Sequence, residues 1–336
     1  MKAIVLRAQA PIGRAALRLE DVARPAPGPG EVLVRVSACA VCRTDLHVVE
    51  GDLPLVRSPL VPGHQVVGRV EAAGAGTARF SVGDRVGIAW LRSTCGTCAF
   101  CASGRENLCP DGAFTGYHAD GGFAEYAVVA EAFAYAIPDA FSDVAAAPLL
   151  CAGIIGYRAL ERADVPPGGR LGIYGFGSSA HVTLQIARAR GCEVYVCTRE
   201  AGRRRLAVEL GAAWAGDVGD PMPRTMHGSI VFAPVGDVVP AALRGLERGG
   251  TVALAGIYMT PTPPLDYARD LFHERQLRSV TANTRADGAA LLAEAARIPL
   301  RLTTTQFPLA EAGRALADLK HGAFAGSGVL LTGDAR

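Results

Sequence analysis

A chain of 336 residues, half of them hydrophobic, can bury a large core and is long enough for two domains. Its 34 basic and 32 acidic residues give a formal net charge of +2, which excludes the strong field expected of a protein that binds nucleic acid or an anionic membrane. Residues 1–10 lack the charged start and apolar core of an export signal, so we expect a cytoplasmic protein whose nine cysteines are thiols or metal ligands.

The first 140 residues predict an all-β domain. Short alternating or β-branched runs, such as residues 31–36 and 65–72, are separated by turn sequences at residues 25–30 and 83–84. A barrel or a sandwich fits this pattern. The most apolar run of the chain, residues 144–157, contains Pro148 and is shorter than the roughly 18 to 20 residues of a membrane helix.

From about Pro148 onward, predicted helices alternate with short buried strands, which is typical of an α/β fold with a doubly wound parallel sheet. The strands are expected at residues 171–174, 193–197, 229–232 and 251–255. The tail predicts helices near 289–297 and 311–320 and strands near 300–307 and 328–331, and these elements fit either domain.

Four cysteines stand close together in the β half, at Cys95, Cys98, Cys101 and Cys109. Four thiolates on short turns match the tetrahedral shell of a closed structural zinc site. The alternative is a pair of disulfides, but cysteines within C-x-x-C turns are poorly placed for such pairing. The pattern therefore favours structural zinc, which shapes a lobe and does no chemistry itself.

A second candidate metal group consists of Cys42, His64 and Cys151. Two thiolates and an imidazole would leave the fourth position of a zinc ion open, as a catalytic site requires. Taken alone, the pattern is ambiguous. A single cysteine is most often a small buried hydrophobe, and a single histidine is most often a hydrogen-bonded core residue.

The α/β half contains a glycine-rich turn between the predicted strand at 171–174 and a helical run at 181–190. Its residues are Gly175, Phe176, Gly177, Ser178, Ser179 and Ala180. In this G-x-G-x-x-A pattern the first glycine allows the tight turn, the second lets a pyrophosphate approach the backbone, and the alanine lets helix and strand pack. The alternative is an ordinary strand-to-helix turn in a protein that binds another ligand.

These motifs occur in the order found in the zinc-dependent medium-chain alcohol dehydrogenases, which the chain resembles along essentially its whole length. The resemblance implies a GroES-like catalytic β domain of residues 1–150, completed by residues 286–336, and a Rossmann domain of residues 151–285. It further implies reversible hydride transfer between an alcohol and a nicotinamide cofactor. A small-molecule alcohol or aldehyde is then the substrate, and a dimer or tetramer is expected.

The same resemblance assigns roles to single residues. Cys42, His64 and Cys151 would hold the catalytic zinc, and the four-cysteine group would hold a second, structural zinc. Asp45 would orient the ligand histidine, and Thr44 and His47 would relay the alcohol proton to solvent. Arg43 and Arg285 would contact the pyrophosphate. Trp90, Tyr117 and Ile154 are candidates for the lining of the substrate pocket or for ordinary core.

One residue departs from the family pattern. Gln65 follows His64 where most relatives have glutamate, so a negative charge beside the metal is lost. Gln65 therefore cannot act as an anionic alternative ligand. Cys39, Cys192 and Cys197 receive no role from the resemblance.

The residue expected at the ribose 2′-hydroxyl is Thr198, where NAD-preferring proteins have an acidic residue. Thr198 does not repel a 2′-phosphate, and Arg199 follows it directly. Arg203, Arg204 and Arg205 lie on the next helix, so the pattern favours NADP, with NAD as the alternative. The opposing interpretation is that these arginines form a solvated helix face and that Glu200 replaces the missing acid.

Three other classes are less consistent with the sequence. A zinc-ribbon protein that binds nucleic acid should be basic, and a zinc-free quinone or enoyl reductase should lack Cys42, His64 and the cysteine lobe. A non-catalytic dinucleotide-binding protein on the same scaffold should have lost Thr44 or His47. A zinc-scaffold reductase for another carbonyl substrate remains the main alternative to an alcohol dehydrogenase.

Overall fold

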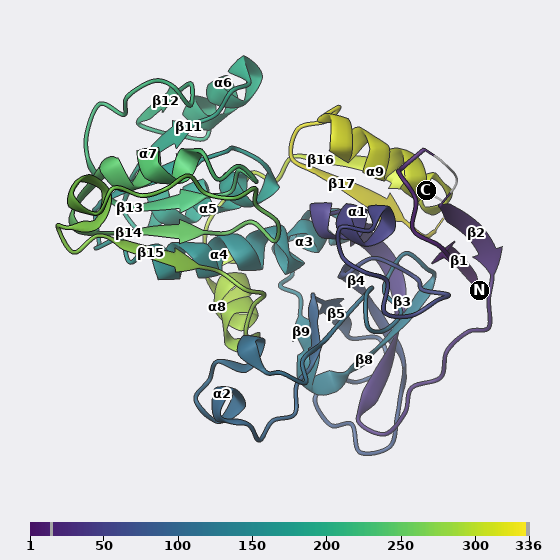
Figure 1. The fold of residues 1–336 in the computed structure, drawn as a ribbon. Helices are drawn as coiled ribbons and strands as arrows, with labels where there is room; N and C mark the ends of the chain where they lie inside the picture. The colour runs from purple at the N-terminus through teal and green to yellow at the C-terminus, as the bar shows by residue number, and fades with distance from the viewer. Residues whose placement is uncertain (14–15, 334–336) are drawn as a thin grey trace. The chain divides into compact units, whose positions relative to one another are not determined.

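The computed structural model describes residues 1–13 and 16–333, and the chain divides into two compact units (Figure 1). Unit 1 contains Met1–Cys151, Ala282–Ala296 and the chain from Thr303 onward, and unit 2 contains Ala152–Thr281 and Arg297–Leu302. Three boundaries differ slightly from those expected. Cys151 and residues 282–285, which were expected in the Rossmann domain, fall in unit 1, and the short segment 297–302 returns to unit 2.

Unit 1 is built on a seven-stranded sheet in the order β16, β17, β3, β4, β5, β9, with β8 paired to β3. The long central strand β3 (Glu31–Ala40) buries alternating β-branched side chains such as Val32, Val34 and Val36. The other strands of this sheet are β4 (Gln65–Ala73), β5 (Arg85–Ile88), β8 (Tyr126–Ala130), β9 (Ala134–Ala136), β16 (Thr304–Pro308) and β17 (Ser327–Leu331). β1 (Lys2–Leu6) and β2 (Leu17–Asp21) form a separate antiparallel pair.

Helix α1 (Arg43–Glu50) was not part of the all-β pattern expected in the first 140 residues, whereas helices near 289–297 and 311–320 were predicted. Helix α1 forms because Cys42 and Asp45 build a capping box at its start, and Gly51, with φ +98°, ends it. Short helices α3 (Asp143–Ala146) and η3 (Ala147–Leu150) lead to Cys151. The tail, which fitted either domain, joins unit 1 through α8 (Arg285–Ala295), α9 (Ala312–His321), β16 and β17.

The four-cysteine segment projects from a two-stranded stem. β6 (Leu91–Ser93) pairs antiparallel with β7 (Ala113–Phe114), and the segment between them contains α2 (Ala99–Ala102) and η1 (Glu106–Leu108). This lobe contains very little regular structure.

Unit 2 is the predicted doubly wound sheet. Its six strands are all parallel, in the order β12, β11, β10, β13, β14, β15. Figure 1 shows the neighbouring strands β13, β14 and β15 side by side. The strands are β10 (Arg170–Tyr174), β11 (Glu193–Cys197), β12 (Trp214–Gly216), β13 (Met226–Val231), β14 (Leu246–Leu254) and β15 (Gln276–Ser279). The helices are α4 (Ala152–Ala163), α5 (Ser178–Ala189), α6 (Ala201–Glu209), α7 (Val238–Arg244) and η4 (Tyr267–Leu271). The strand order reverses between β10 and β13, and folds of this kind bind ligands beyond the carboxyl ends of the strands at such a point.

Among residues 1–13 and 16–333, no single helix is long and apolar enough to cross a membrane. Within this described part of the chain, one bent helix pair, Asp143–Leu150 with Ala152–Ala163, passes the length and composition test together.

Candidate functional site

The structure brings together Cys42, His64 and Cys151, although Cys42 and Cys151 are 109 residues apart. Their ligand atoms all lie within 4.8 Å of one another, and the two sulfur atoms are 3.8 Å apart. That separation fits two thiolates on one zinc ion, because Zn–S bonds of about 2.3 Å place tetrahedral sulfurs about 3.8 Å apart. Nε2 of His64 is buried and has no hydrogen-bond partner among the described residues. A buried nitrogen without a partner beside two thiols fits the role of a metal ligand.

Asp45 holds two of these three residues in place. Its Oδ1 lies 2.9 Å from Nδ1 of His64, and its Oδ2 accepts the backbone N–H of Cys42 at 2.8 Å. Because Nδ1 is bound to Asp45, Nε2 is the histidine nitrogen that faces the two sulfurs. Cys42 also sits at the N-terminus of α1, where the helix dipole favours a thiolate.

The surroundings of the site lower the pKa of Cys42 and raise the pKa values of Cys151, His64 and Asp45. The hydrogen bond from the Cys151 thiol lowers the pKa of Cys42 well below its usual value and outweighs the effect of burial, and the same bond raises the pKa of Cys151. Burial lowers the pKa of His64, but the Asp45 carboxylate and Cys42 raise it more, to about 10. Burial raises the pKa of Asp45, against the opposing effect of His64.

Thr44 and His47 lie on the same face of α1, because they are three residues apart. Thr44 is buried, and its hydroxyl oxygen lies 3.6 Å from the Cys42 sulfur. His47 is more exposed, and its Nδ1 lies 2.7 Å from Oδ2 of Asp52. The two side chains therefore run from the metal-ligand cluster towards a partly exposed carboxylate. Sequence analysis did not identify Asp52, although it lies only five residues beyond His47.

Aromatic rings pack beside His64. The Trp90 ring meets the His64 ring edge to face, with ring centroids 5.0 Å apart. Trp90 also stacks on the rings of Phe114 and Tyr117, with centroid distances of 4.9 and 6.0 Å. The Tyr117 hydroxyl donates to the Pro54 carbonyl at 2.9 Å. Trp90 and Tyr117, two of the pocket candidates, thus belong to the surroundings of the metal-ligand cluster.

Ile154, Gln65 and the three cysteines without an assigned role are buried in the structure. Ile154 is fully buried in α4. Gln65 is buried, and its side-chain amide donates to the Ala40 carbonyl at 3.2 Å, so the amide fastens the start of β4 to β3. Cys39, Cys192 and Cys197 are buried thiols.

The four cysteines of the lobe converge as predicted. The ligand atoms of Cys95, Cys98, Cys101 and Cys109 all lie within 4.8 Å of one another. Cys95 lies 4.0 Å from Cys101 and 3.5 Å from Cys109, sulfur to sulfur. Backbone N–H groups of Thr97 and Cys98 lower the pKa of Cys95 to about 6, so the thiolate that a metal needs is favoured. Both of these sulfur–sulfur distances are much longer than an S–S bond, which is about 2.0 Å long, and the four cysteines are free thiols.

The glycine-rich turn has a tight bend at Gly175 and an open backbone at Gly177. Gly175 has φ +90°, and a Cβ at this position would lie 2.8 Å from the backbone nitrogen of Ala233. Its own N–H donates to Cys197 at the end of β11, at 2.8 Å. A Cβ at Gly177 would meet no described atom within 4 Å, so the backbone is open to a ligand where α5 begins. Ala180 is fully buried against the sheet.

Beyond β11, the structure gives different roles to the residues expected near the ribose. Thr198 is buried, and its hydroxyl donates to Glu200 Oε2 at 3.1 Å. Arg203 lies 3.7 Å from the same carboxylate. Arg204 donates to the Thr198 and Arg199 carbonyls at 2.8 Å each, so it braces the loop. Arg199 and Arg205 are exposed, and Ser179 in the first turn of α5 is partly buried.

Arg285 has a partner that sequence analysis did not identify. Its guanidinium makes a bidentate contact with the Glu106 carboxylate, with distances of 3.0 and 2.6 Å, and stacks over the Phe133 ring. Glu106 also accepts the backbone N–H of Arg285 at 2.8 Å. The pair is 179 residues apart, so no local pattern predicts it. Arg43, the other pyrophosphate candidate, is exposed at the start of α1.

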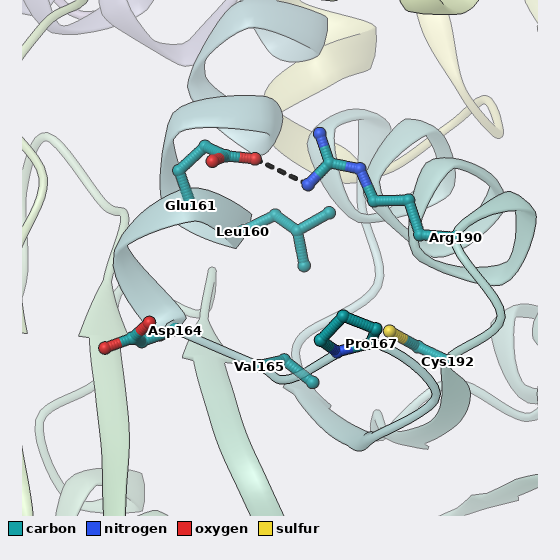
Figure 2. A pocket seen from close by; sticks show the side chains of 7 residues that line it. All are labelled: Leu160, Glu161, Asp164, Val165, Pro167, Arg190 and Cys192. Carbon is teal, nitrogen blue, oxygen red and sulfur yellow. Dashed lines mark hydrogen bonds and ion pairs between the residues drawn. The ribbon is translucent and has the colours of Figure 1, made fainter.

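Unit 2 also contains a cavity of about 280 Å³, shown in Figure 2. Apolar side chains form part of its wall, and an ion pair of 2.5 Å joins Glu161 and Arg190 across it. Burial raises the pKa of Cys192, so its thiol is a weak nucleophile at neutral pH. The cavity is lined by Leu160, Glu161, Asp164, Val165, Pro167, Arg190 and Cys192, none of which is a predicted site residue.

Comparisons with known proteins agree with both units. Residues 28–139 match the family model of the alcohol dehydrogenase GroES-like domain, and residues 180–297 match that of the zinc-binding dehydrogenases. A probable alcohol dehydrogenase AdhA of Mycobacterium tuberculosis is 53% identical, over 98% of this chain and 97% of the relative. An alcohol dehydrogenase of Geobacillus stearothermophilus is 36% identical, over 94% of this chain and 95% of the relative. The solved structure of a thermostable alcohol dehydrogenase from Pyrobaculum aerophilum aligns with a TM-score of 0.88 at 29% identity, covering 99% of each chain.

Proposed function

The chain belongs to the zinc-dependent medium-chain alcohol dehydrogenases, and from this premise we propose that Cys42, His64 and Cys151 hold the zinc at which an alcohol is oxidised. The observation that carries this assignment is the buried Nε2 of His64, which has no hydrogen-bond partner among the described residues and lies within 4.8 Å of both sulfurs. Three protein ligands leave one coordination position for the alcohol oxygen.

When bound there, zinc would act as a Lewis acid that polarises the alcohol oxygen and lowers its pKa. The residues of the chain prepare this site. Asp45 fixes the orientation of His64 and the backbone of Cys42, and the N-terminus of α1 stabilises the Cys42 thiolate. Because both ligands are preset, little reorganisation is needed when metal and substrate bind.

The alcohol proton is assigned to a path along α1. The Thr44 hydroxyl is buried beside the metal-ligand cluster and can accept and donate a proton. His47 lies one turn further along the same face, and Asp52 holds its Nδ1. This arrangement supports His47 as the group that exchanges the proton with solvent. A nicotinamide cofactor, when bound, would supply the hydride acceptor of the reaction.

The four cysteines of the lobe are proposed to hold a second zinc ion with a structural role. The lobe has few helices or strands of its own, so four metal bonds would contribute much of its stability. Two zinc ions per chain follow from the two groups.

For the cofactor, we propose binding at Gly175, Gly177, Ser178, Ser179 and Ala180, with a preference for NADP. Thr198 has no charge to repel a 2′-phosphate, and exposed Arg199 is next to it. Glu200 opposes this preference, because its carboxylate lies beside the Thr198 hydroxyl. Arg43 and Arg285 are kept as pyrophosphate contacts, Arg285 through the side of its guanidinium that Glu106 does not occupy.

A homo-oligomer is also proposed. β15 is an edge strand of the sheet in unit 2, and Leu277 on it and the nearby Tyr267 and Phe272 are exposed. An edge strand with exposed apolar residues is a surface on which another chain can pair. Light scattering during size-exclusion chromatography tests this proposal, and a monomer would contradict it.

The function is tested by incubating the purified protein with a panel of primary and secondary alcohols and either NAD or NADP, and following nicotinamide reduction by absorbance. Activity that is lost in Cys42→Ser and on chelation, and restored by zinc, supports the proposal. Full activity in Cys42→Ser would contradict the assigned site, and carbonyl reduction without any alcohol oxidation would favour the alternative reductase.

A further inference from the structure

Residues 120–123, which we name the clamp segment, form hydrogen bonds with residues 61–63, the turn that precedes His64. Gly121 N–H donates to the Val61 carbonyl at 2.7 Å, and Gly122 N–H donates to Gly63 at 2.9 Å. The next residue, Phe123, donates to Pro62 at 3.0 Å. In the opposite direction, Val61 N–H donates to Oδ1 of Asp120 at 2.9 Å. Four hydrogen bonds therefore fix the backbone of residues 61–63, immediately before the metal-ligand candidate.

The close contact between the two segments requires glycine at three positions, Gly63, Gly116 and Gly121, where a side chain would collide with neighbouring atoms. A Cβ at Gly121 would lie 1.9 Å from the Gly63 carbonyl oxygen, and one at Gly116 would lie 2.8 Å from the Gly63 nitrogen. Gly63 itself has φ +96°, and its Cβ would lie 2.3 Å from the ring of Phe123. No side chain fits at any of these positions without moving the turn.

The position of this turn decides where the His64 ring lies. His64 is completely buried, and Asp45 on α1 holds its Nδ1 at 2.9 Å. The position of the ring therefore depends on two groups, the Asp45 carboxylate that contacts Nδ1 and the backbone of Gly63 that precedes His64. A displacement of the turn by about 1 Å would take Nε2 out of bonding distance, since zinc–nitrogen bonds lie within about 0.2 Å of 2.0–2.1 Å.

We propose that the clamp segment is a positioning element of the metal site, which holds Nε2 of His64 at bonding distance from a zinc ion shared with Cys42 and Cys151. The inference rests on the proposed function. None of residues 120–123 is a metal ligand, so their effect acts through the turn at Gly63.

Three variants separate this role from general stability. Gly121→Ala places a methyl group against the Gly63 carbonyl and should displace the turn. Asp120→Ala removes the acceptor for Val61 N–H, whereas Asp120→Asn keeps a carbonyl acceptor and should behave like the native protein. The matched control is Gly313→Ala on α9, where an added Cβ meets no atom of the described chain within 4 Å.

The measurement is metal binding on the full chain. The three-ligand site is loaded with Co²⁺, whose visible absorption depends on ligand geometry, and the affinity is obtained from metal loss to a chelator. The melting temperature of each variant is measured separately. We expect affinity to fall at least about tenfold in Gly121→Ala and several-fold in Asp120→Ala. The cobalt spectrum should change in both, while the four-cysteine metal is retained. Asp120→Asn and Gly313→Ala should keep native affinity.

Native cobalt spectra and native affinity in Gly121→Ala and Asp120→Ala would overturn the inference, whatever their melting temperatures. If Gly121→Ala does not fold, Asp120→Ala decides alone, because its side chain is half-exposed. A native chain that takes up no metal at Cys42, His64 and Cys151 would instead overturn the proposed function. The two failures are therefore distinguishable.

Discussion

The Asp45 carboxylate joins two candidate metal ligands, because one oxygen lies 2.9 Å from Nδ1 of His64 and the other accepts the Cys42 N–H at 2.8 Å. Asp45 is itself almost completely buried. Both candidate ligands therefore depend on one side chain that is not itself a member of the three-residue group.

Replacing Asp45 by asparagine should weaken metal binding at this site by about 10- to 100-fold, the usual effect of losing a carboxylate behind a histidine ligand. The amide keeps one acceptor and loses the charge that favours the bound histidine. Affinity is measured by competition with a chromophoric chelator, with exposed Asp139→Asn as the control. Native affinity in Asp45→Asn would show that this carboxylate does not support the site.

Residues close in sequence were predicted more completely than residues brought together by folding. Asp45 and Thr44 were assigned beside Cys42 from the family resemblance, because they follow it closely in sequence, although helix α1 was not expected there. The parallel sheet of unit 2 was predicted because its buried strands alternate with helices. Glu106 and Arg285, and the contact of Gly121 with Gly63, could not be predicted, since each depends on how distant segments pack.

If His47 exchanges the proton with solvent, His47→Gln should slow alcohol oxidation at least about tenfold. The loss should be largest at low pH, where hydroxide that could replace the imidazole is scarce. Added imidazole should restore part of the rate. Asp52→Asn should give a smaller loss, because Asp52 only holds Nδ1. A pH profile unchanged from that of the native protein would remove His47 from the proton path.

Glu106 should stabilise the fold above acidic pH. Burial raises its pKa, but the hydrogen bonds from Arg285 lower it more, so the folded pKa lies below the usual value. A carboxylate with a lowered folded pKa contributes stability above the unfolded value of about 4.3, and loses it as pH falls through the folded pKa.

Glu106→Gln should therefore lower the free energy of unfolding at pH 7 by about 1 kcal/mol, a value kept small because Arg285 is half-exposed. The difference from the native protein should shrink as pH falls below about 4. Urea unfolding at several pH values measures it, with the exposed Asp21→Asn as the control. An equal loss at all pH values would mean that the Glu106 charge contributes nothing.

The cofactor preference is decided by kcat/KM for NADP and NAD with one alcohol. We expect the native enzyme to favour NADP, and Arg199→Ala and Thr198→Asp to shift the ratio towards NAD by about tenfold, or ~1.4 kcal/mol. Glu200→Gln should shift it towards NADP, because it removes the nearby carboxylate. Arg224→Ala, a change at an exposed arginine elsewhere in unit 2, should leave the ratio unchanged. A native preference for NAD of tenfold or more would contradict this prediction.

The central claim is that Cys42, His64 and Cys151 hold a catalytic zinc ion distinct from a structural one. Anomalous diffraction at the zinc edge, from crystals of the native protein and of Cys42→Ser, tests it most directly. The account predicts two zinc peaks in the native protein, one at about 2.0–2.3 Å from these three ligands and one among the four cysteines of the lobe. In Cys42→Ser only the lobe peak should persist at full height. A native crystal with zinc in the lobe alone, from a preparation that oxidises alcohols, would contradict it.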